Sequence, residues 1–266
     1  MQFRNGDLLI DYSDDGEGLP VVLLHGFAND RMIWRPQIEA LRTRYRIIAP
    51  TLRGFGASSR TDGQAVSMDR YADDIVALLD YLKIDRAVIG GISLGGYVVF
   101  SIALRHAQRT AGLILAHTRA TADNPDWAAY REALLHDIEQ RGAVAVMENY
   151  GDKPFSPTCP ADIKEDVRRM ILRQPPAGLL SCMRGMAQRP DRSAGLSGIQ
   201  VPTLVISGTE DVYMPSVEGE AMHRAIAGST FVNIPGGGHA SNVDSAAAFN
   251  KAVEKFLEPL ARRFRP

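Results

Sequence analysis

The chain has 266 residues, of which 45% are hydrophobic and 23% charged, so it can bury a substantial core as one large α/β domain or two small domains. The net charge of −1, from 30 basic and 31 acidic residues, predicts no general attraction to nucleic acid or to anionic membranes. The two cysteines, Cys159 and Cys182, have neither metal-ligand spacing nor the pattern of a disulfide framework. No apolar run approaches the roughly 18 residues that span a bilayer, and the first residues lack the apolar core of a signal peptide. We therefore expect a cytoplasmic protein with no nucleic-acid or membrane partner.

Short apolar runs alternate with helical patterns along most of the chain, which predicts a parallel sheet with helices on both faces. An early strand at Leu8–Tyr12 is expected to pair antiparallel at the edge of this sheet. In chain order, the later strands are expected at Val21–Leu24, Arg46–Ala49, Ala87–Gly90, Leu113–Ala116, Thr203–Ile206 and Thr230–Asn233. The spacing of apolar residues predicts helices at Trp34–Arg42, Met68–Lys83, Leu94–His106 and Ser245–Leu260.

Residues 120–196 interrupt this alternation, because they contain helical patterns and several prolines but no convincing strand. A helical insertion between two core strands would lie beyond the strand ends, where ligands bind in open α/β sheets. The chain is therefore predicted to divide into a core domain, residues 1–119 and 197–266, and a helical cap domain, residues 120–196.

The pentapeptide Gly91-Ile92-Ser93-Leu94-Gly95 follows a predicted strand and opens a predicted helix. In that context a G-x-S-x-G motif places its serine on a strained turn, and the flanking glycines let the neighbouring backbone pack closely. The helix N-terminus favours negative charge that develops beside the serine. We therefore predict that Ser93 is a nucleophile rather than an ordinary helix cap.

A loop after the Val21–Leu24 strand carries His25-Gly26-Phe27. Acyl transfer passes through a tetrahedral oxyanion, which requires preorganised N–H donors. The backbone N–H of Phe27 and that of Leu94, directly after the nucleophile, are the candidate donors. His25 is a candidate for substrate binding, although we prefer a structural role in which it braces this loop.

The base and the acid are expected at strand ends downstream of the nucleophile. His239 follows three glycines after the last predicted strand, and Asp211 follows the Thr203–Ile206 strand. The order Ser, acid, His supports this pair. Glu210 is the alternative acid. His117, at the end of the Leu113–Ala116 strand, is the alternative site histidine, and no carboxylate stands beside it.

These motifs resemble those of the α/β-hydrolase family over nearly the whole chain, from about Asp7 to Leu260. Residues 52–58 (Leu-Arg-Gly-Phe-Gly-Ala-Ser) and 90–97 are similar to family loops, and residues 118–123 look most like the carboxylesterase and 3-oxoadipate enol-lactonase-like group. The resemblance implies an α/β-hydrolase fold: a mostly parallel eight-stranded sheet flanked by helices, with a helical cap inserted after the sixth strand. It also implies a triad of Ser93, Asp211 and His239, with Phe27 and Leu94 as oxyanion donors.

The predicted activity is hydrolysis of a carboxylic ester or lactone through an acyl-enzyme intermediate, without a cofactor or a metal. Ser93 at the turn between strand and helix argues against the chemistry of haloalkane dehalogenases and epoxide hydrolases, in which an aspartate at this turn is the nucleophile. Carbon–carbon bond hydrolysis and cofactor-free perhydrolysis use the same triad and stay open, as does a ligand receptor that retains the triad. The expected partner is a small ester or lactone, and the protein is expected to be a monomer or a homodimer.

The insertion is expected to cover the acyl pocket. Its apolar side chains include Trp127 and Met183, which we predict to contact substrate, and its methionines suit a pliable wall. Arg119, where the chain enters the insertion, is a candidate for binding a substrate carboxylate, although a structural salt bridge is the commoner role for such an arginine.

Overall fold

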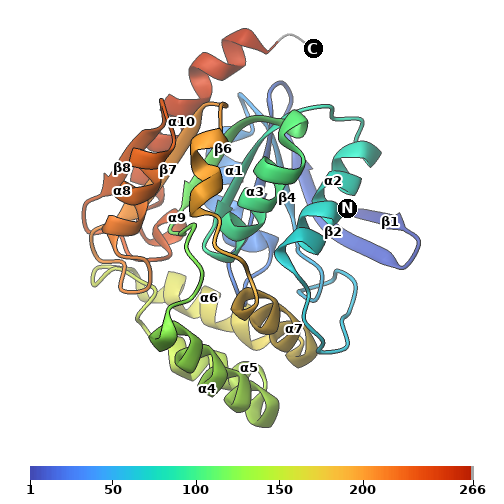
Figure 1. The fold of residues 1–266 in the computed structure, drawn as a ribbon, viewed down its shortest axis with the longest axis vertical. Helices are drawn as coiled ribbons and strands as arrows, with labels where there is room; N and C mark the ends of the chain where they lie inside the picture. Colours follow the sequence, from blue (N-terminus) through green and yellow to red (C-terminus); the bar gives the residue numbers. More distant parts are fainter. Residues whose placement is uncertain (265–266) are drawn as a thin grey trace.

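The computed structural model of the chain describes residues 1–264, which form one eight-stranded sheet flanked by helices (Figure 1). The strand order is β1-β2-β4-β3-β5-β6-β7-β8. The strands are β1 Gln2–Asn5, β2 Leu8–Asp15, β3 Pro20–Leu24, β4 Arg46–Pro50, β5 Ala87–Ile92, β6 Thr110–Ala116, β7 Thr203–Gly208 and β8 Thr230–Ile234. Strand β2 pairs antiparallel with β1 and β4, and the other neighbours run parallel. This arrangement is the α/β-hydrolase fold that the sequence resemblance implies.

The six predicted parallel strands are all present, and every residue of β3, β5 and β7 is buried. Burial on both faces explains why these strands are continuous apolar runs in the sequence. The predicted position of the first strand was wrong, because β2 lies between β1 and β4 and the edge is formed by β1. Strand β1 buries only Phe3, so it has no alternating apolar pattern that would reveal it.

Helices of the core pack on the sheet and fix the ends of its strands. They are η1 Arg31–Trp34, α1 Arg35–Leu41, α2 Met68–Tyr81, α3 Leu94–Arg105, η2 Ala107–Arg109, α8 Ser216–Ala225, α9 Ser241–Asp244 and α10 Ala246–Arg263. Helix α3 packs on β5 and β6 with α2 beside it, while α1 packs on α10. No helix among residues 1–264 is long and apolar enough to cross a membrane.

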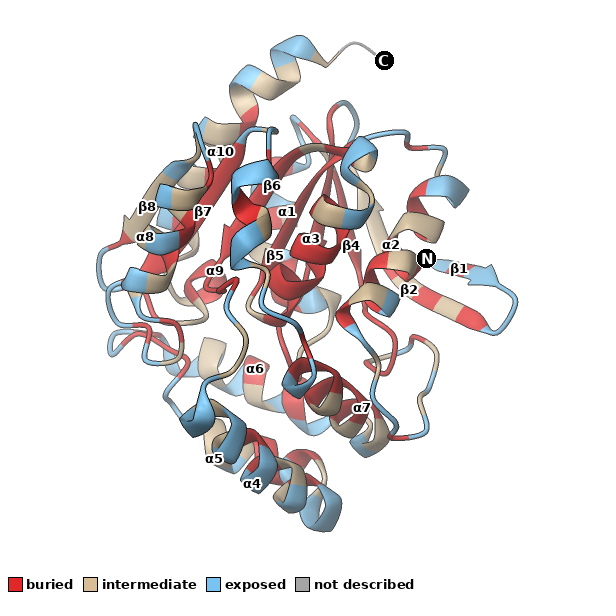
Figure 2. Cartoon of the chain, viewed as in Figure 1, coloured by how far each residue is buried: buried red, intermediate tan, exposed pale blue. Residues whose placement is uncertain are grey.

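Between β6 and β7 the chain forms α4 Pro125–Arg141, α5 Ala143–Tyr150, α6 Ala161–Leu172, α7 Pro176–Ala187 and the short η3 Ser193–Gly198. We call α4–α7 the cap helices. Figure 1 shows them gathered on one side of the molecule, opposite the C-terminus. Helices α4 and α5 expose much of their outer surface, whereas α7 is largely buried (Figure 2). The exact division into two domains stays a prediction.

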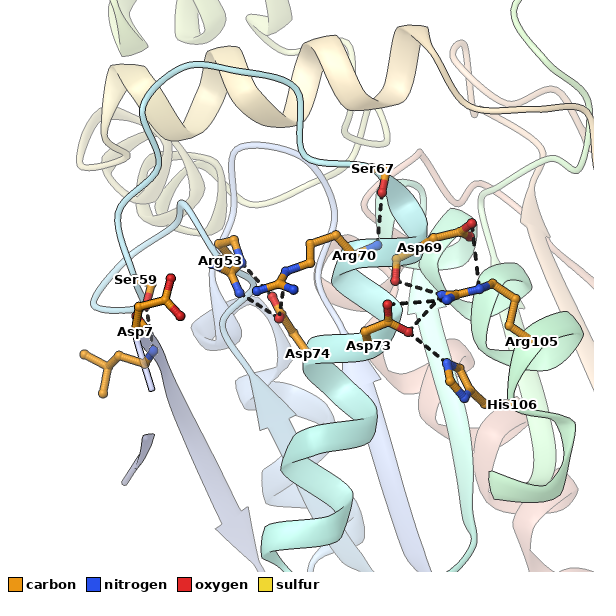
Figure 3. Close-up of polar contacts among 11 residues, drawn as sticks. Asp7, Arg53, Ser59, Ser67, Asp69, Arg70, Asp73, Asp74, Arg105 and His106 are labelled. Carbon is orange, nitrogen blue, oxygen red and sulfur yellow. Dashed lines mark hydrogen bonds and ion pairs between the residues drawn. The ribbon is translucent and has the colours of Figure 1, made fainter. Parts of the chain in front are cut away.

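A buried ion pair ties the loop after β4 to α2. The guanidinium of Arg53 donates to both carboxylate oxygens of Asp74 at 2.8 and 2.7 Å (Figure 3). Ser67 caps the same helix by accepting from the backbone N–H of Arg70 at 3.1 Å. On the helix surface, His106 at the end of α3 contacts Asp73 at 2.9 Å. These contacts join α2 to the loop on one side and to α3 on the other.

Candidate active site

Ser93 stands at the sharp turn between β5 and α3. Its backbone has φ 54° and ψ −113°, a left-handed conformation that is unfavourable for a residue with a side chain. Two hydrogen bonds hold the turn: the N–H of Ser93 donates to the carbonyl of Ala116 at 3.0 Å, and the hydroxyl of Thr118 donates to the carbonyl of Ser93 at 3.0 Å. The serine is thereby fixed at the N-terminus of α3, beyond the end of a central strand.

The glycines around Ser93 are required by close backbone packing. A Cβ on Gly91 would collide with the backbone of Gly95, and a Cβ on Gly95 would collide with the carbonyl of Leu24 in β3. The second contact brings the start of α3 against the end of β3, where the loop with Phe27 begins. The spacing of the motif therefore reflects sterics as well as chemistry.

The predicted oxyanion donors are free. Within residues 1–264, the backbone N–H groups of Phe27 and Leu94 donate to no acceptor in the protein. Leu94 is the first residue of α3, and Phe27 lines a cavity together with Ser93. Two unpaired donors beside a serine are the groups that a tetrahedral oxyanion needs.

His25 is fully buried and both its ring nitrogens are occupied. Its Nε2 accepts from the N–H of Leu52 at 2.9 Å, so its Nδ1 carries the proton and donates to the carbonyl of Gly26 at 2.8 Å. Burial lowers the pKa of His25 to about 4, against the raising effects of that hydrogen bond and of Asp30. The contacts match the bracing role, because the neutral ring joins the loop after β3 to the loop after β4.

Asp211 follows β7 and turns its carboxylate toward His239, which follows β8. The Oδ1 of Asp211 accepts from the backbone N–H groups of Tyr213 and Met214, both at 2.9 Å. The Nδ1 of His239 lies 2.9 Å from Oδ2 and 3.1 Å from Oδ1. Because an ionised carboxylate only accepts, Nδ1 of His239 carries a proton and Nε2 is left as the acceptor. That is the tautomer of a general base.

A second histidine contacts the same carboxylate. His117 is fully buried, its Nδ1 lies 2.8 Å from Oδ2 of Asp211, and its Nε2 lies 2.6 Å from Oγ of Ser241. Burial by itself would raise the pKa of Asp211, but the charge of His239 and hydrogen bonds from both histidines hold that pKa well below its usual range. The ligand atoms of His117, Asp211 and His239 lie within 4.8 Å of one another, close enough to hold a metal ion. Hydrogen bonds between one acid and two imidazoles account for the cluster.

Two cavities meet at Ser93 and His239, and both are also lined by Phe27 and Tyr150. One, which we call the aliphatic cavity, has a further lining that includes Ile33, Ile92, Met147, Pro154, Phe155, Val167 and Ile171. The other, which we call the tyrosine cavity, has a further lining of Tyr97, Trp127, Tyr130, Arg131, Met183, Met186, Tyr213 and Met214. The cap helices thus supply much of the wall around the serine.

Two of the predicted pocket residues line a cavity and a third does not. Trp127 and Met183 line the tyrosine cavity beside Ser93. Arg119 is buried, donates to Asp123 at 2.7 Å and lies over the ring of Trp127, and it lines neither cavity. Its position fits the structural salt bridge that we considered the commoner role.

Arg131 is the charged residue that lines the tyrosine cavity, and its sequence pattern did not indicate this position. Asp123 pairs with Arg119, Arg131 and Arg189, whose side chains are all buried, so three guanidinium groups share one carboxylate. Among the described residues, the Nη1 of Arg131 contacts only the sulfurs of Met183 and Met186, which are weak acceptors. The hydroxyls of Tyr97 and Tyr213 in the same cavity have no partner within residues 1–264. The cavity therefore presents positive charge and free hydroxyls.

The chain is similar to known proteins over most of its length. A family model described as "alpha/beta hydrolase fold" matches residues 20–246. The chain is 28% identical over 257 residues to 3-oxoadipate enol-lactonase 2 of Acinetobacter baylyi, covering 95% of this chain and 94% of that protein. A thermophilic esterase from Thermogutta terrifontis, solved with malate bound, superposes with a TM-score of 0.90 at 35% identity and covers 96% of this chain and 94% of its own. The enol-lactonase of Burkholderia xenovorans superposes with a TM-score of 0.88 at 28% identity, covering 97% and 100%.

Proposed function

Because this chain belongs to the α/β-hydrolase family, we propose that it hydrolyses carboxylic esters or lactones with Ser93 as nucleophile, His239 as base and Asp211 as orienting acid. The observation that carries the proposal is the arrangement at the cavity. Ser93, with its strained backbone, and His239, whose Nε2 is left as an acceptor, line one cavity. The buried carboxylate of Asp211 binds the other ring nitrogen of His239, Nδ1.

The chemistry follows from these positions. Nε2 of His239 takes the hydroxyl proton of Ser93 as Oγ attacks the carbonyl carbon. The N–H groups of Phe27 and Leu94 stabilise the oxyanion, and His239 returns the proton to the departing alkoxide. Water, activated by the same histidine, then attacks the acyl-enzyme and releases the acid. With a lactone the leaving alcohol stays attached to the acyl chain, so ring opening needs no additional catalytic group.

Substrate size is constrained by the two cavities, which enclose about 50 and 40 Å³. Each holds only a few water molecules, since one needs about 10–15 Å³ on this measure. This volume favours short acyl and alcohol groups. The expected preference is for acetate and propionate esters and small lactones over long-chain esters.

Charge in the tyrosine cavity favours a substrate with a carboxylate. The three arginines around Asp123 leave an excess of buried positive charge, and Arg131 brings it to the cavity wall. A substrate carboxylate would supply the oxygen acceptors that Arg131 and the Tyr97 hydroxyl lack. One of the similar structures, the Thermogutta esterase, was solved with malate bound, and malate is a dicarboxylate.

The test is a substrate panel of p-nitrophenyl acetate, longer p-nitrophenyl esters and small lactones, measured with the wild type and with Ser93→Ala. We expect turnover of the short substrates by the wild type and loss of about 10⁴-fold or more in the variant. Binding of these compounds without turnover by the wild type would favour a ligand receptor and contradict the proposal.

A further inference from the structure

His117 is held against Asp211 by the sheet itself. It follows the last residue of β6, and its backbone N–H donates to the carbonyl of Ile206 in the neighbouring β7 at 2.8 Å. Its φ of 47° lies in the left-handed region, which histidine adopts more readily than most residues but still at a cost. The mechanism above gives this strained and fully buried side chain no role.

The hydrogen-bond partners of His117 fix its protons. Asp211 can only accept when ionised, so Nδ1 of His117 donates to Oδ2 at 2.8 Å. Nε2 faces the hydroxyl of Ser241 at 2.6 Å, and that hydroxyl can donate to it. A neutral ring therefore satisfies both contacts. His117 and His239 accordingly present the same kind of N–H to the same oxygen, Oδ2 of Asp211.

We propose that His117 is a positioning residue of the triad. It shares Oδ2 of Asp211 with His239, prevents rotation of the carboxylate and partly neutralises its negative charge. This inference rests on the proposed hydrolase function. A carboxylate that already accepts from a second imidazole stabilises the charged form of its partner less than an unshared one does. Removal of the His117 donor should therefore strengthen the attraction between Asp211 and the charged ring of His239 that forms during catalysis.

Other groups around His239 do not supply this effect. The cavity walls carry Arg131 on α4 and Arg168 on α6, with Tyr97 on α3, Tyr130 on α4, Tyr150 on α5 and Tyr213 after β7. Near about pH 6 arginine side chains are charged and tyrosine side chains are neutral, so neither type changes its charge there. Asp244 of α9 accepts from the N–H groups of Gly238 and Ser156. His117 is therefore the neighbour, among residues 1–264, that shares the orienting acid with His239.

The experiment compares two substitutions of His117 that differ in one donor. His117→Asn keeps an N–H in the place of Nδ1, and asparagine tolerates the left-handed backbone. His117→Leu removes the N–H donor and replaces the imidazole with an apolar side chain of similar size. Each is measured for the pH profile of kcat/KM on p-nitrophenyl acetate, after a thermal melt has established that the variant is folded.

We expect the acid limb of the His117→Leu profile to move to higher pH by about half to one unit. The His117→Asn limb should stay near the wild-type position. A shift of equal size in both variants, or none in His117→Leu, would overturn the positioning role, because a packing role alone would lower the plateau without moving the limb.

A second measurement does not depend on turnover. The proton NMR spectrum should contain a low-field Nδ1–H signal of His117 that persists in His239→Ala and disappears in Asp211→Ala. Absence of that signal from the folded wild type would overturn the proposal that both histidines share the carboxylate of Asp211. Because this measurement uses the wild type, it tests the proposal even if His117→Leu does not fold. Absence of ester turnover by the wild type would instead overturn the proposed hydrolase function.

Discussion

Nδ1 of His239 lies 2.9 Å from Oδ2 and 3.1 Å from Oδ1 of Asp211, so both oxygens of one carboxylate hold one imidazole. The two residues follow β7 and β8, which are neighbours in the sheet. The carboxylate is itself fixed by the backbone N–H groups of Tyr213 and Met214. The orientation of the ring therefore depends on the folded core rather than on a mobile side chain.

Asp211→Asn should lower kcat by about 10⁴-fold, because an amide no longer fixes the tautomer or stabilises the charged imidazole. The matched control is Glu210→Gln, which alters the adjacent and exposed acid. We expect this control to stay within about 3-fold of the wild type, the range of an exposed substitution away from the reacting groups. Steady-state kinetics on p-nitrophenyl acetate measure both. A larger loss in Glu210→Gln than in Asp211→Asn would reverse the choice of acid.

Sequence patterns predicted the parts of the site that depend on local geometry. The turn at Ser93 is encoded by the glycines two residues away on either side, because Gly91 packs against the backbone of Gly95 and Gly95 packs against the carbonyl of Leu24. Strand β7, which precedes Asp211, is fully buried, and β8, which precedes His239, contains the partly buried Phe231 and Val232. The residues at the ends of both strands could therefore be located. Strand β1 escaped prediction because it buries a single side chain.

The surroundings of two side chains near the site depend on contacts between distant segments. His117 stood at a predicted strand end, but its contact with Asp211 could be located only once β6 and β7 were known to be adjacent. Arg131 gave no signal, because a basic residue on a helix is usually exposed. Its burial results from α4 packing on α7, which supplies Met183 and Met186.

Arg131→Gln should remove the proposed preference for substrates that carry a carboxylate. We expect kcat/KM for 4-acetoxybutanoate to fall by about 10–100-fold, the value of one charge-assisted hydrogen bond, while butyl acetate changes little. The measurement is a comparison of kcat/KM for these two esters, which differ in the terminal carboxylate.

Arg189→Gln is the control for general charge. It removes the same charge from the group around Asp123 but does not line the tyrosine cavity. The ratio of kcat/KM for the two esters should therefore stay close to the wild-type ratio. Equal loss of the preference in both variants would show that the arginines act through the overall field and not through a contact made by Arg131.

Asp123 should make stability depend on pH in the acid range. Burial raises its pKa, but Arg131 and Arg189 outweigh burial and hold the pKa below its ordinary value. A depressed folded-state pKa gives stability that is present above the unfolded pKa of about 3.9 and is lost as pH falls through the folded value. Asp123→Asn should lose about 3 kcal/mol at neutral pH and show a shallower decline below about pH 4.

Urea unfolding at a series of pH values measures this dependence. Asp126→Asn is the control, because Asp126 lies at the exposed start of α4, three residues along the chain. Its acid slope should match that of the wild type. An Asp123→Asn slope as steep as the wild-type slope would contradict the role assigned to the buried arginines.

Asp74→Ala should destabilise the fold by about 3–5 kcal/mol, because it leaves the Arg53 guanidinium buried without its partner. Asp80→Ala on the same helix breaks an ion pair whose acid is 64% exposed, and we expect a loss of at most about 1 kcal/mol. Denaturant unfolding compares the two. Similar losses would show that the buried pair contributes no more than a surface one.

Ser93 should carry the acyl group during turnover. The direct measurement is acid quench of the enzyme during hydrolysis of p-nitrophenyl acetate, followed by peptide mass spectrometry. In the wild type we predict an acetyl group on the peptide that contains Ser93. In His239→Ala the acetylated peptide should accumulate once the serine has reacted, and in Ser93→Ala it should be absent. An acetyl group at another residue, or steady turnover by Ser93→Ala, would contradict the account.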